Sequence, residues 1–87
     1  MKIFHRDIIA GGVPVKRDTD FFRNLTSCGS RNNRALYKDR KGFYFQWDGL
    51  HGEWEKFDRA TGRHLGTLNE DGTKQVKKAV KSRRILI

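Results

Sequence analysis

One histidine and three carboxylates lie within the nine residues WDGLHGEWE, which run from Trp47 to Glu55. Imidazole and carboxylate groups are the side chains that most often move protons near neutral pH, so this composition favours general acid/base chemistry. Carboxylates beside an imidazole favour its protonated form, which suits His51 to the role of acid. Glu55 or Asp48 would stay ionised in basic surroundings and would act as the base. The simpler alternative is a solvated turn in which these groups are surface charges.

The rest of the chain is strongly basic. It has 19 Lys and Arg against 10 Asp and Glu among 87 residues, a net charge of +9 and a pI near 10.2. Such a field attracts polyanions, so nucleic acid is the first candidate partner. An anionic membrane is less favoured, because no segment reads as a basic amphipathic helix and the run at 8–15 is too short to span a bilayer. Cys28 is the single cysteine, which excludes an internal disulfide.

The C-terminal part of the chain carries the densest positive charge. Tyr44, an aromatic residue on the predicted outward face of a strand, precedes it. We expect these side chains to bind phosphates and, for Tyr44, to stack on a base, although a merely solvated basic stripe is the alternative. The candidate RNA-binding residues are Tyr44, Lys74, Lys77, Lys78, Lys81 and Arg84. His64, beside Leu65, is expected to be structural. With RNA as the polyanion, an acid, a base and a cation are what metal-free cleavage at a 2′-OH requires.

The elements that must position these groups follow from the patterning. The segment RDTDFFRNLTSCGS at 17–30 predicts a short helix, capped by Asp18 or Thr19 and stopped by Gly29. A short strand is expected at 2–9, and SRNNR at 30–34 reads as a polar loop. At 73–82, Val76 and its neighbours have helical spacing, and RRILI at 83–87 is strand-like.

Alternation from Gly42 to Asp48 and again up to about Asp58 predicts a β-hairpin. Its turn is either Asp48-Gly49 or Gly49-Leu50, and the second would put Asp48 opposite His51. Both turns place the histidine and the acids on the outward face, with the Cα atoms of His51 and Glu55 about 13 Å apart along the strand. A third strand at 63–68 completes a meander. The fold class predicted is α+β, a small, highly twisted antiparallel sheet with one or two short flanking helices.

From about Tyr37 to the end, the chain closely resembles the C-terminal cytotoxic domain of the ribosome-inactivating colicins, a family with relatives in contact-dependent inhibition toxins and pyocins. WDGLHGEWE with GRHLG downstream, followed by RRI, carries the resemblance. No resemblance is detected in residues 1–34. The chain is therefore divided into an N-terminal segment with a short helix (1–34) and a ribonuclease region (35–87), within one compact domain.

The resemblance implies catalytic roles for Asp48, His51 and Glu55, with an essential arginine at Arg83 or, after a one-residue shift, at Arg84. It implies metal-independent cleavage of 16S ribosomal RNA in the decoding centre, without a cofactor, and inhibition by an acidic immunity protein. We expect a monomer that acts in the cytoplasm of a target bacterium, free-standing or delivered as the C-terminal part of a larger toxin.

Two other functions compete with this one. A non-catalytic module that binds RNA or ribosomes would need only the charge and the aromatic side chains. A metal-dependent DNA nuclease is disfavoured, because no second histidine or asparagine motif surrounds a metal position in the sequence.

Overall fold

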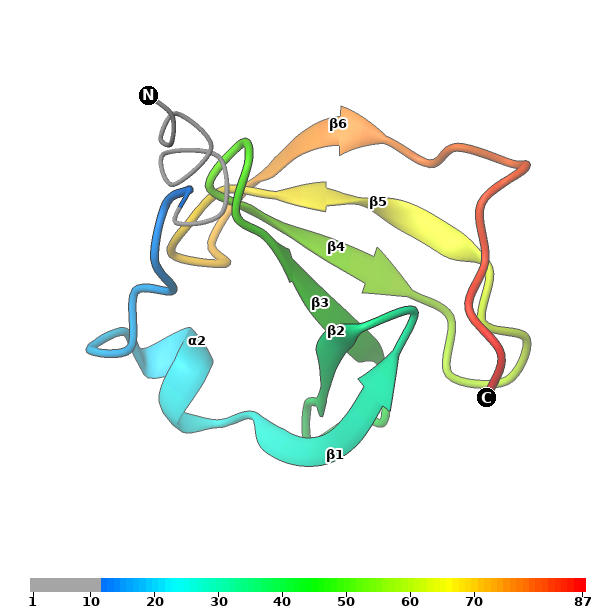
Figure 1. Cartoon of the computed structure of the whole chain (residues 1–87), viewed down its shortest axis with the longest axis horizontal. Coiled ribbons are helices and arrows are strands. Elements are labelled where there is room, and N and C mark those ends of the chain that lie inside the picture. The colour runs from blue at the N-terminus through cyan, green and yellow to red at the C-terminus, as the bar shows by residue number, and fades with distance from the viewer. Residues whose placement is uncertain (1–11) are drawn as a thin grey trace, which may run out of the picture.

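The computed structural model describes residues 12–87, and the strand expected at 2–9 lies outside them. Within residues 12–87, one short helix precedes six strands that form a single antiparallel sheet in chain order (Figure 1). The elements are α2 (Asp20–Arg23), β1 (Thr26–Arg31), β2 (Arg34–Lys38), β3 (Tyr44–Asp48), β4 (Glu53–Phe57), β5 (His64–Leu68) and β6 (Gln75–Lys78). The α+β class, with a small twisted meander and a short helix, is confirmed. Within the described residues, no helix is long and apolar enough to cross a membrane.

The helix is shorter than the sequence predicts. Thr19 is its N-cap and accepts a hydrogen bond from the backbone N–H of Phe22 at 3.0 Å, while Asp20 and Arg23 suit the two ends of the helix dipole. It ends at Arg23 instead of continuing to Gly29. The residues that follow pair with β2 as a strand, and this pairing satisfies more backbone groups than another isolated helical turn would.

The segment expected as a polar loop contains the tight turn of the β1–β2 hairpin. Asn32 and Asn33 have φ of 54° and 64°, and Arg31 pairs with Arg34 on either side of them. Two consecutive residues with positive φ are the requirement of a two-residue hairpin turn whose twist matches the strands, and asparagine tolerates that region better than most residues.

One face of the sheet is covered by α2. The ring of Phe21 packs edge-on against Phe45 and Trp54, with centroids 5.1 and 5.4 Å apart, and Phe22 packs against Tyr37 at 5.5 Å. Phe45 and Trp54 are almost completely buried. Adjacent phenylalanines on a single helical turn are therefore enough to close this half of the core.

The opposite face is concave and is closed by the C-terminal segment. Residues 79–87 run back from β6 toward β1 (Figure 1), where Arg31 Nε donates to the carbonyl of Leu86 at 2.6 Å. Ile85 is buried there with Leu36 and Phe57. Two expectations are wrong: residues 75–78 form a strand, not a helix, and the RRILI end forms only an isolated bridge at Arg84.

Gly62, in the β4–β5 turn, fits its position only because it lacks a side chain. It has φ of 77°, and a Cβ there would overlap the carbonyl oxygen of Ile85. We expect Gly62→Ala to destabilise the fold by about 2 kcal/mol or more, from backbone strain plus the displaced C-terminal segment. For a domain of this size, that lowers the melting temperature by roughly 8 °C or more.

Gly29→Ala is the matched control for this prediction. Gly29 also has positive φ, 91°, but a Cβ there meets nothing within 4 Å. This variant should be destabilised only by the backbone strain of an alanine with positive φ. Equal melting temperatures for the two variants would mean that the contact between the turn and the C-terminal segment contributes nothing.

Candidate active site

The β3–β4 connection is a four-residue loop, 49–52, and not either of the two-residue turns expected. Asp48 pairs with Glu53, and the backbone N–H of Gly52 donates to the carbonyl of Asp48 at 2.8 Å. Asp48 Oδ1 accepts from the N–H groups of Leu50 and His51 at 3.0 and 3.3 Å. The aspartate thus caps the turn that carries the histidine.

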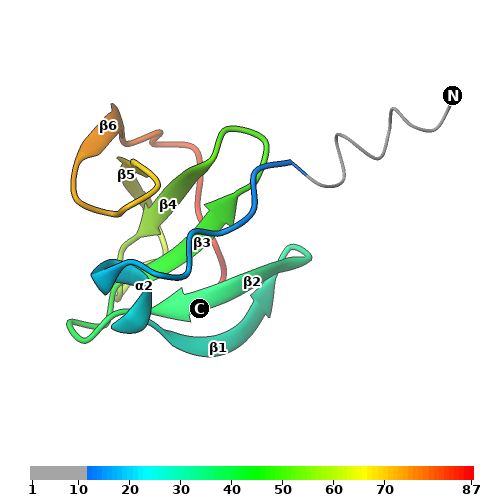
Figure 2. The same cartoon turned by 90° about the vertical axis from the view of Figure 1, so that its left-hand side faces the viewer.

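Residues before α2 support this loop from outside. The backbone N–H of Val13 donates to the carbonyl of Gly49, and Trp47 Nε1 donates to the carbonyl of Val13, each at 2.7 Å. Figure 2 shows this segment running past the β3–β4 loop toward α2. The loop is therefore fixed both by its own aspartate and by the chain upstream.

Asp48 also orients the imidazole of His51. Its Oδ2 lies 2.8 Å from His51 Nδ1, and the His51 side chain is 53% exposed. Burial alone would raise the pKa of Asp48, but the hydrogen bonds from the His51 side chain and backbone, the His51 charge and the Leu50 N–H together lower it. Asp48 is thus a carboxylate near neutral pH that keeps the proton on Nδ1 and leaves Nε2 of this half-exposed side chain outside the contact.

The acids lie on one face, as expected, but that face is the concave one and is partly shielded from solvent, with Glu55 almost completely buried. Glu55 pairs with Gln46 and with Thr67, so all three side chains share it with Asp48. Gln46, Glu55 and Thr67 are 4, 3 and 2% exposed. The face is covered because the strongly twisted sheet curls and the C-terminal segment closes part of it.

Glu55 is held by three partners on one oxygen. His64 Nε2 lies 2.7 Å from Glu55 Oε1, Thr67 Oγ1 donates to it at 2.8 Å, and Arg83 Nη1 lies 3.5 Å away. The backbone N–H of Val80 donates to His64 Nδ1 at 2.9 Å, so the proton of this imidazole is on Nε2 and is donated to the carboxylate. Because the contacts converge on Oε1, they leave Oε2 with its lone pairs for another proton.

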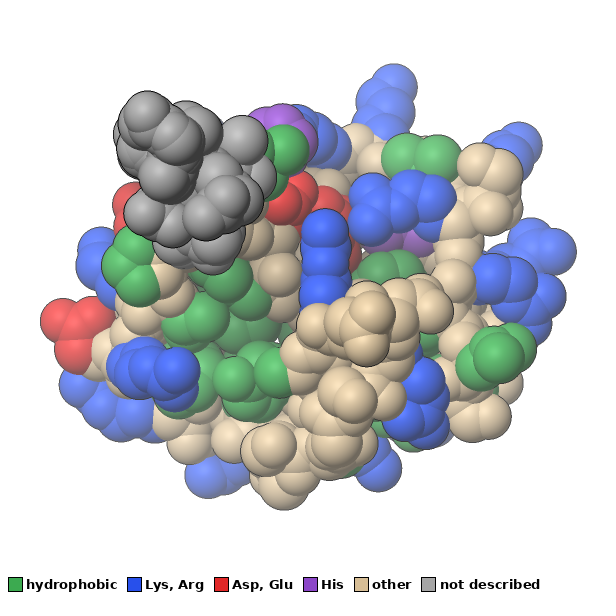
Figure 3. Space-filling model, viewed as in Figure 1, with side chains coloured by type: hydrophobic (Ala, Val, Ile, Leu, Met, Phe, Trp, Pro, Cys, Tyr) green, Lys and Arg blue, Asp and Glu red, His purple; other side chains and the backbone are tan. Residues whose placement is uncertain are grey.

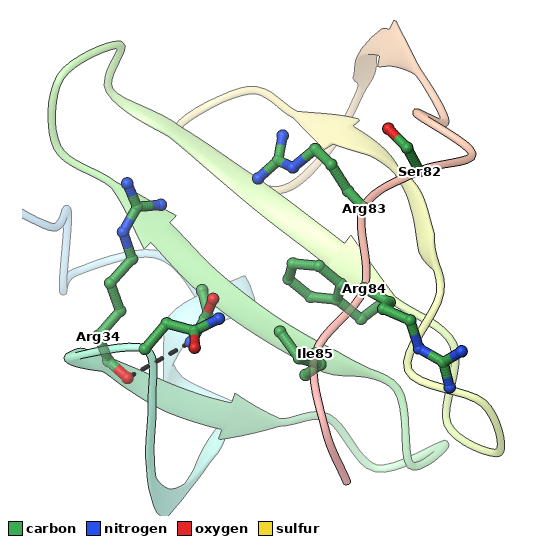
Figure 4. A pocket seen from close by; sticks show the side chains of 8 residues that line it. Arg34, Ser82, Arg83, Arg84 and Ile85 are labelled. Carbon is green, nitrogen blue, oxygen red and sulfur yellow. Dashed lines mark hydrogen bonds between the residues drawn. The ribbon is translucent and has the colours of Figure 1, made fainter.

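The two candidate arginines point to different places. Arg83 extends toward Glu55, whereas Arg84 Nη2 donates to the carbonyl of Thr61 in the β4–β5 turn at 3.0 Å. In Figure 4 their guanidinium groups lie on opposite sides of the C-terminal segment. The geometry favours Arg83 as the cation of the cluster.

Glu53 completes the acidic cluster and is paired with a lysine. Lys77 Nζ lies 2.9 Å from Glu53 Oε1, and this hydrogen bond, more than the charges of Glu53, Glu55 and Asp48, raises the pKa of Lys77. Figure 3 shows a small group of acidic side chains with Lys and Arg side chains near it on the face in view. Ligand atoms of Asp48, His51 and Glu53 lie within 4.8 Å of one another, so within residues 12–87 this trio could hold a metal ion. Two of these carboxylates already have partners, since His51 Nδ1 lies 2.8 Å from Asp48 and Lys77 Nζ lies 2.9 Å from Glu53.

The remaining predicted RNA-binding residues lie on β3, on β6 and in the segments that flank β6. Tyr44, on β3, is half-buried and packs against the core of the concave face. Lys78 lies on β6, at the edge of the sheet, where it pairs with Gly66 of β5. Lys74 and Lys81 lie in the segments that flank β6, and both are exposed. Among all the predicted RNA-binding residues, only Lys77 forms an ion pair with an acid of the cluster.

Sequence reasoning missed the groups that hold Glu55. His64 was expected to be structural, and it is buried, but it contacts the candidate base itself. Thr67 is not among the predicted site residues. The signal that finds them is hairpin pairing: once the β4–β5 turn is centred on residues 60–62, Glu55 faces Thr67 and the side chain of His64 lies beside it.

Fold and site together define a small, basic β-sheet protein with a cluster of proton-transfer groups on its concave face. The sequence model of the Cytotoxic family matches residues 12–86, so the chain belongs to that family. The match indicates a toxin and is consistent with a colicin-type cytotoxic domain; it extends farther toward the N-terminus than the motifs described above. None of the curated proteins compared with the chain matches it.

Proposed function

We propose that this protein is a ribonuclease toxin of the colicin type that cleaves 16S ribosomal RNA in the decoding centre and so blocks translation. One observation carries this proposal: two groups of side chains lie on the same concave face. Glu55 contacts Arg83 and His64, and Asp48 contacts His51. The protein that presents them has a net charge of +9. Family membership and the motif WDGLHGEWE support the assignment.

The proposed reaction is a transesterification. Glu55 removes the proton from a ribose 2′-OH, the 2′-oxygen attacks phosphorus, and the bond from phosphorus to the 5′-oxygen breaks. Protonated His51 gives its Nε2 proton to that oxygen, leaving a 2′,3′-cyclic phosphate and a 5′-OH. Arg83 stabilises the charge that develops on the phosphate oxygens. Asp48 and His64 hold the acid and the base in orientation and touch no reacting atom.

Incubation of purified protein with 70S ribosomes in excess EDTA tests this function. We expect one discrete fragment from near the 3′ end of 16S RNA that begins with a 5′-OH, and a cyclic phosphate at the new 3′ terminus of the remaining RNA. Polyamine keeps the ribosomes intact in EDTA. If cleavage is lost in EDTA and returns when Mg²⁺ is added, the trio Asp48, His51 and Glu53 works through a metal instead. Binding without cleavage would support a non-catalytic RNA-binding module.

Affinity for RNA should fall steeply with salt, because each phosphate contact contributes roughly −0.7 to −0.9 to the slope of log K against log salt. Lys74 and Lys78 are exposed basic residues on and beside β6. We expect the variant Lys74→Ala/Lys78→Ala to reduce the magnitude of the slope by about 1.5 if both contact phosphates, without moving the cleavage position.

The control for net charge is Arg40→Ala/Lys41→Ala, which removes two positive charges from the β2–β3 turn. Fluorescence anisotropy with labelled RNA at several salt concentrations gives both slopes. Equal slopes for the two double variants would show that long-range charge, and no local contact near β6, determines the affinity.

We further propose that an acidic immunity protein binds the basic surface from Lys74 to Arg84. Opposite net charges raise association rates above the ordinary ~10⁵–10⁶ M⁻¹s⁻¹, and salt reduces that gain. The product of the gene immediately downstream is the candidate, and its association rate should fall with added salt. A neutral or basic product that still protects cells would contradict this electrostatic account and leave the catalytic assignment untouched.

A further inference from the structure

A cavity of about 400 Å³ opens beside the proposed site, between the β1–β2 hairpin and the C-terminal segment. Arg34, Arg83 and Arg84 are among its lining residues, together with amide, hydroxyl and apolar groups, and no carboxylate lines it. The volume is in the range of pockets that hold small ligands, roughly 300–1,000 Å³. Its lining therefore suits an anion that carries a sizeable polar group.

The hairpin places Arg34 at the edge of this cavity. Gln46 Nε2 donates to the carbonyl of Arg31 at 2.8 Å and to that of Arg34 at 3.4 Å, so a buried side chain of β3 holds the hairpin in place. Figure 4 shows the guanidinium groups of Arg34 and Arg83 extending to the same side of the cavity, away from Arg84. Among residues 12–87, no carboxylate forms an ion pair with Arg34.

The cavity also adjoins the candidate base. Gln46, on its wall, is the pairing partner of Glu55, and Arg83 belongs to both places because its Nη1 lies 3.5 Å from Glu55 Oε1. A chain of nucleotides whose scissile phosphate lies at Glu55 and Arg83 would continue into the cavity.

We propose that this cavity is a nucleotide subsite, which binds the residue next to the cleaved phosphodiester and in which Arg34 contacts that nucleotide's phosphate. Guanidinium groups bind phosphate through paired, charge-assisted hydrogen bonds. The amide of Asn32 and the Oε1 of Gln46, whose Nε2 already donates to the hairpin, supply hydrogen-bonding groups for a base edge, as in other sites that read single-stranded RNA. The connection to cleavage rests on the proposed function, but nucleotide binding does not.

The test is an NMR titration of isotope-labelled protein with adenosine 5′-monophosphate, compared with adenosine and with inorganic phosphate. None of these ligands can be cleaved at a phosphodiester. We expect saturable shifts for the backbone amides of the cavity lining and tighter binding of the nucleotide than of either fragment. Loss of one charge-assisted hydrogen bond in Arg34→Ala should weaken nucleotide binding by about tenfold.

Arg40→Ala is the matched control, since Arg40 is exposed and lies beyond the other end of β2. It should bind the nucleotide like wild type. Equal weakening by both variants, or shifts spread without saturation over the basic surface, would reduce the effect to net charge and overturn the subsite. Phosphate that binds as tightly as the nucleotide would overturn the ligand class.

A cleavage assay on ribosomes separates this inference from the proposed function. Arg34→Ala should raise KM about tenfold with kcat near wild type, because it removes binding to a group that does not react. If wild type binds the nucleotide in the cavity but cleaves no RNA, the proposed function fails and the subsite stands. If cleavage proceeds and Arg34→Ala changes neither KM nor nucleotide binding, the subsite fails alone.

Discussion

His51→Ala should lose about 10²- to 10⁴-fold in the rate of ribosome cleavage while the fold and the affinity for RNA stay nearly unchanged. The side chain is 53% exposed and its contact in the cluster is with Asp48, so its removal leaves no cavity in either core. Single-turnover cleavage of 70S ribosomes, followed on denaturing gels, gives the rate. Circular dichroism and anisotropy with labelled RNA check folding and binding.

Leu50→Ala is a control within the same loop, because Leu50 is 70% exposed and only its backbone N–H is used by Asp48. It should retain activity. Cleavage by His51→Ala within about threefold of wild type would show that the assigned acid is wrong.

Asp48→Asn tests the orientation of the acid separately from the acid itself. An asparagine keeps an oxygen that can accept from the loop N–H groups, but its amide nitrogen cannot accept the hydrogen bond that His51 Nδ1–H donates to Asp48 Oδ2. The imidazole should then turn or change tautomer, and the activity should approach that of His51→Ala without loss of thermal stability. Full activity in this variant would mean that the 2.8 Å contact between Asp48 and His51 has no role in the reaction.

The sequence predicts the central hairpin well because its faces are set by a strict alternation. Phe45 and Trp47 alternate with Gln46 and Asp48, and the structure keeps those faces although the pairing register differs from both expected turns. The alternation could not predict the pairing register of β3 and β4. That register depends on Asp48 accepting from the N–H groups of Leu50 and His51 and on Gly52 adopting φ of 69°. A four-residue loop preserves the same faces as a two-residue turn, so alternation alone cannot distinguish them.

Tertiary contacts decided the elements that local patterns predicted wrongly. Val76 and the apolar residues after it have helical spacing in the sequence. The edge of β5, however, has backbone groups left to pair, and the strand Gln75–Lys78 forms hydrogen bonds with them. The burial of Glu55 likewise cannot be predicted from the residues next to it in the sequence. It follows from His64 and Thr67 across the next hairpin and from a C-terminal segment that folds back over the concave face.

The second large effect is expected at Arg83. Its Nη1 lies 3.5 Å from Glu55 Oε1, where it can also meet the charge that develops on a phosphate during cleavage. Removal of one such group typically costs about 10²- to 10³-fold in kcat. We therefore expect Arg83→Ala to fall in this range, and Arg83→Lys to recover part of the loss, because it keeps the charge but not the paired donors.

Arg84→Ala is the decisive comparison, since it removes the same charge from the adjacent residue. Arg84 donates to the carbonyl of Thr61, away from Glu55, so its loss should change kcat by less than about threefold and act mainly on the stability of the β4–β5 turn. Both variants lose one positive charge, and any effect of net charge on ribosome docking should appear equally in their KM values. The difference in kcat therefore reports the position of the guanidinium and not the field of the protein. A larger loss in kcat for Arg84→Ala than for Arg83→Ala would reverse the assignment and require the C-terminal segment to shift by one residue when RNA binds.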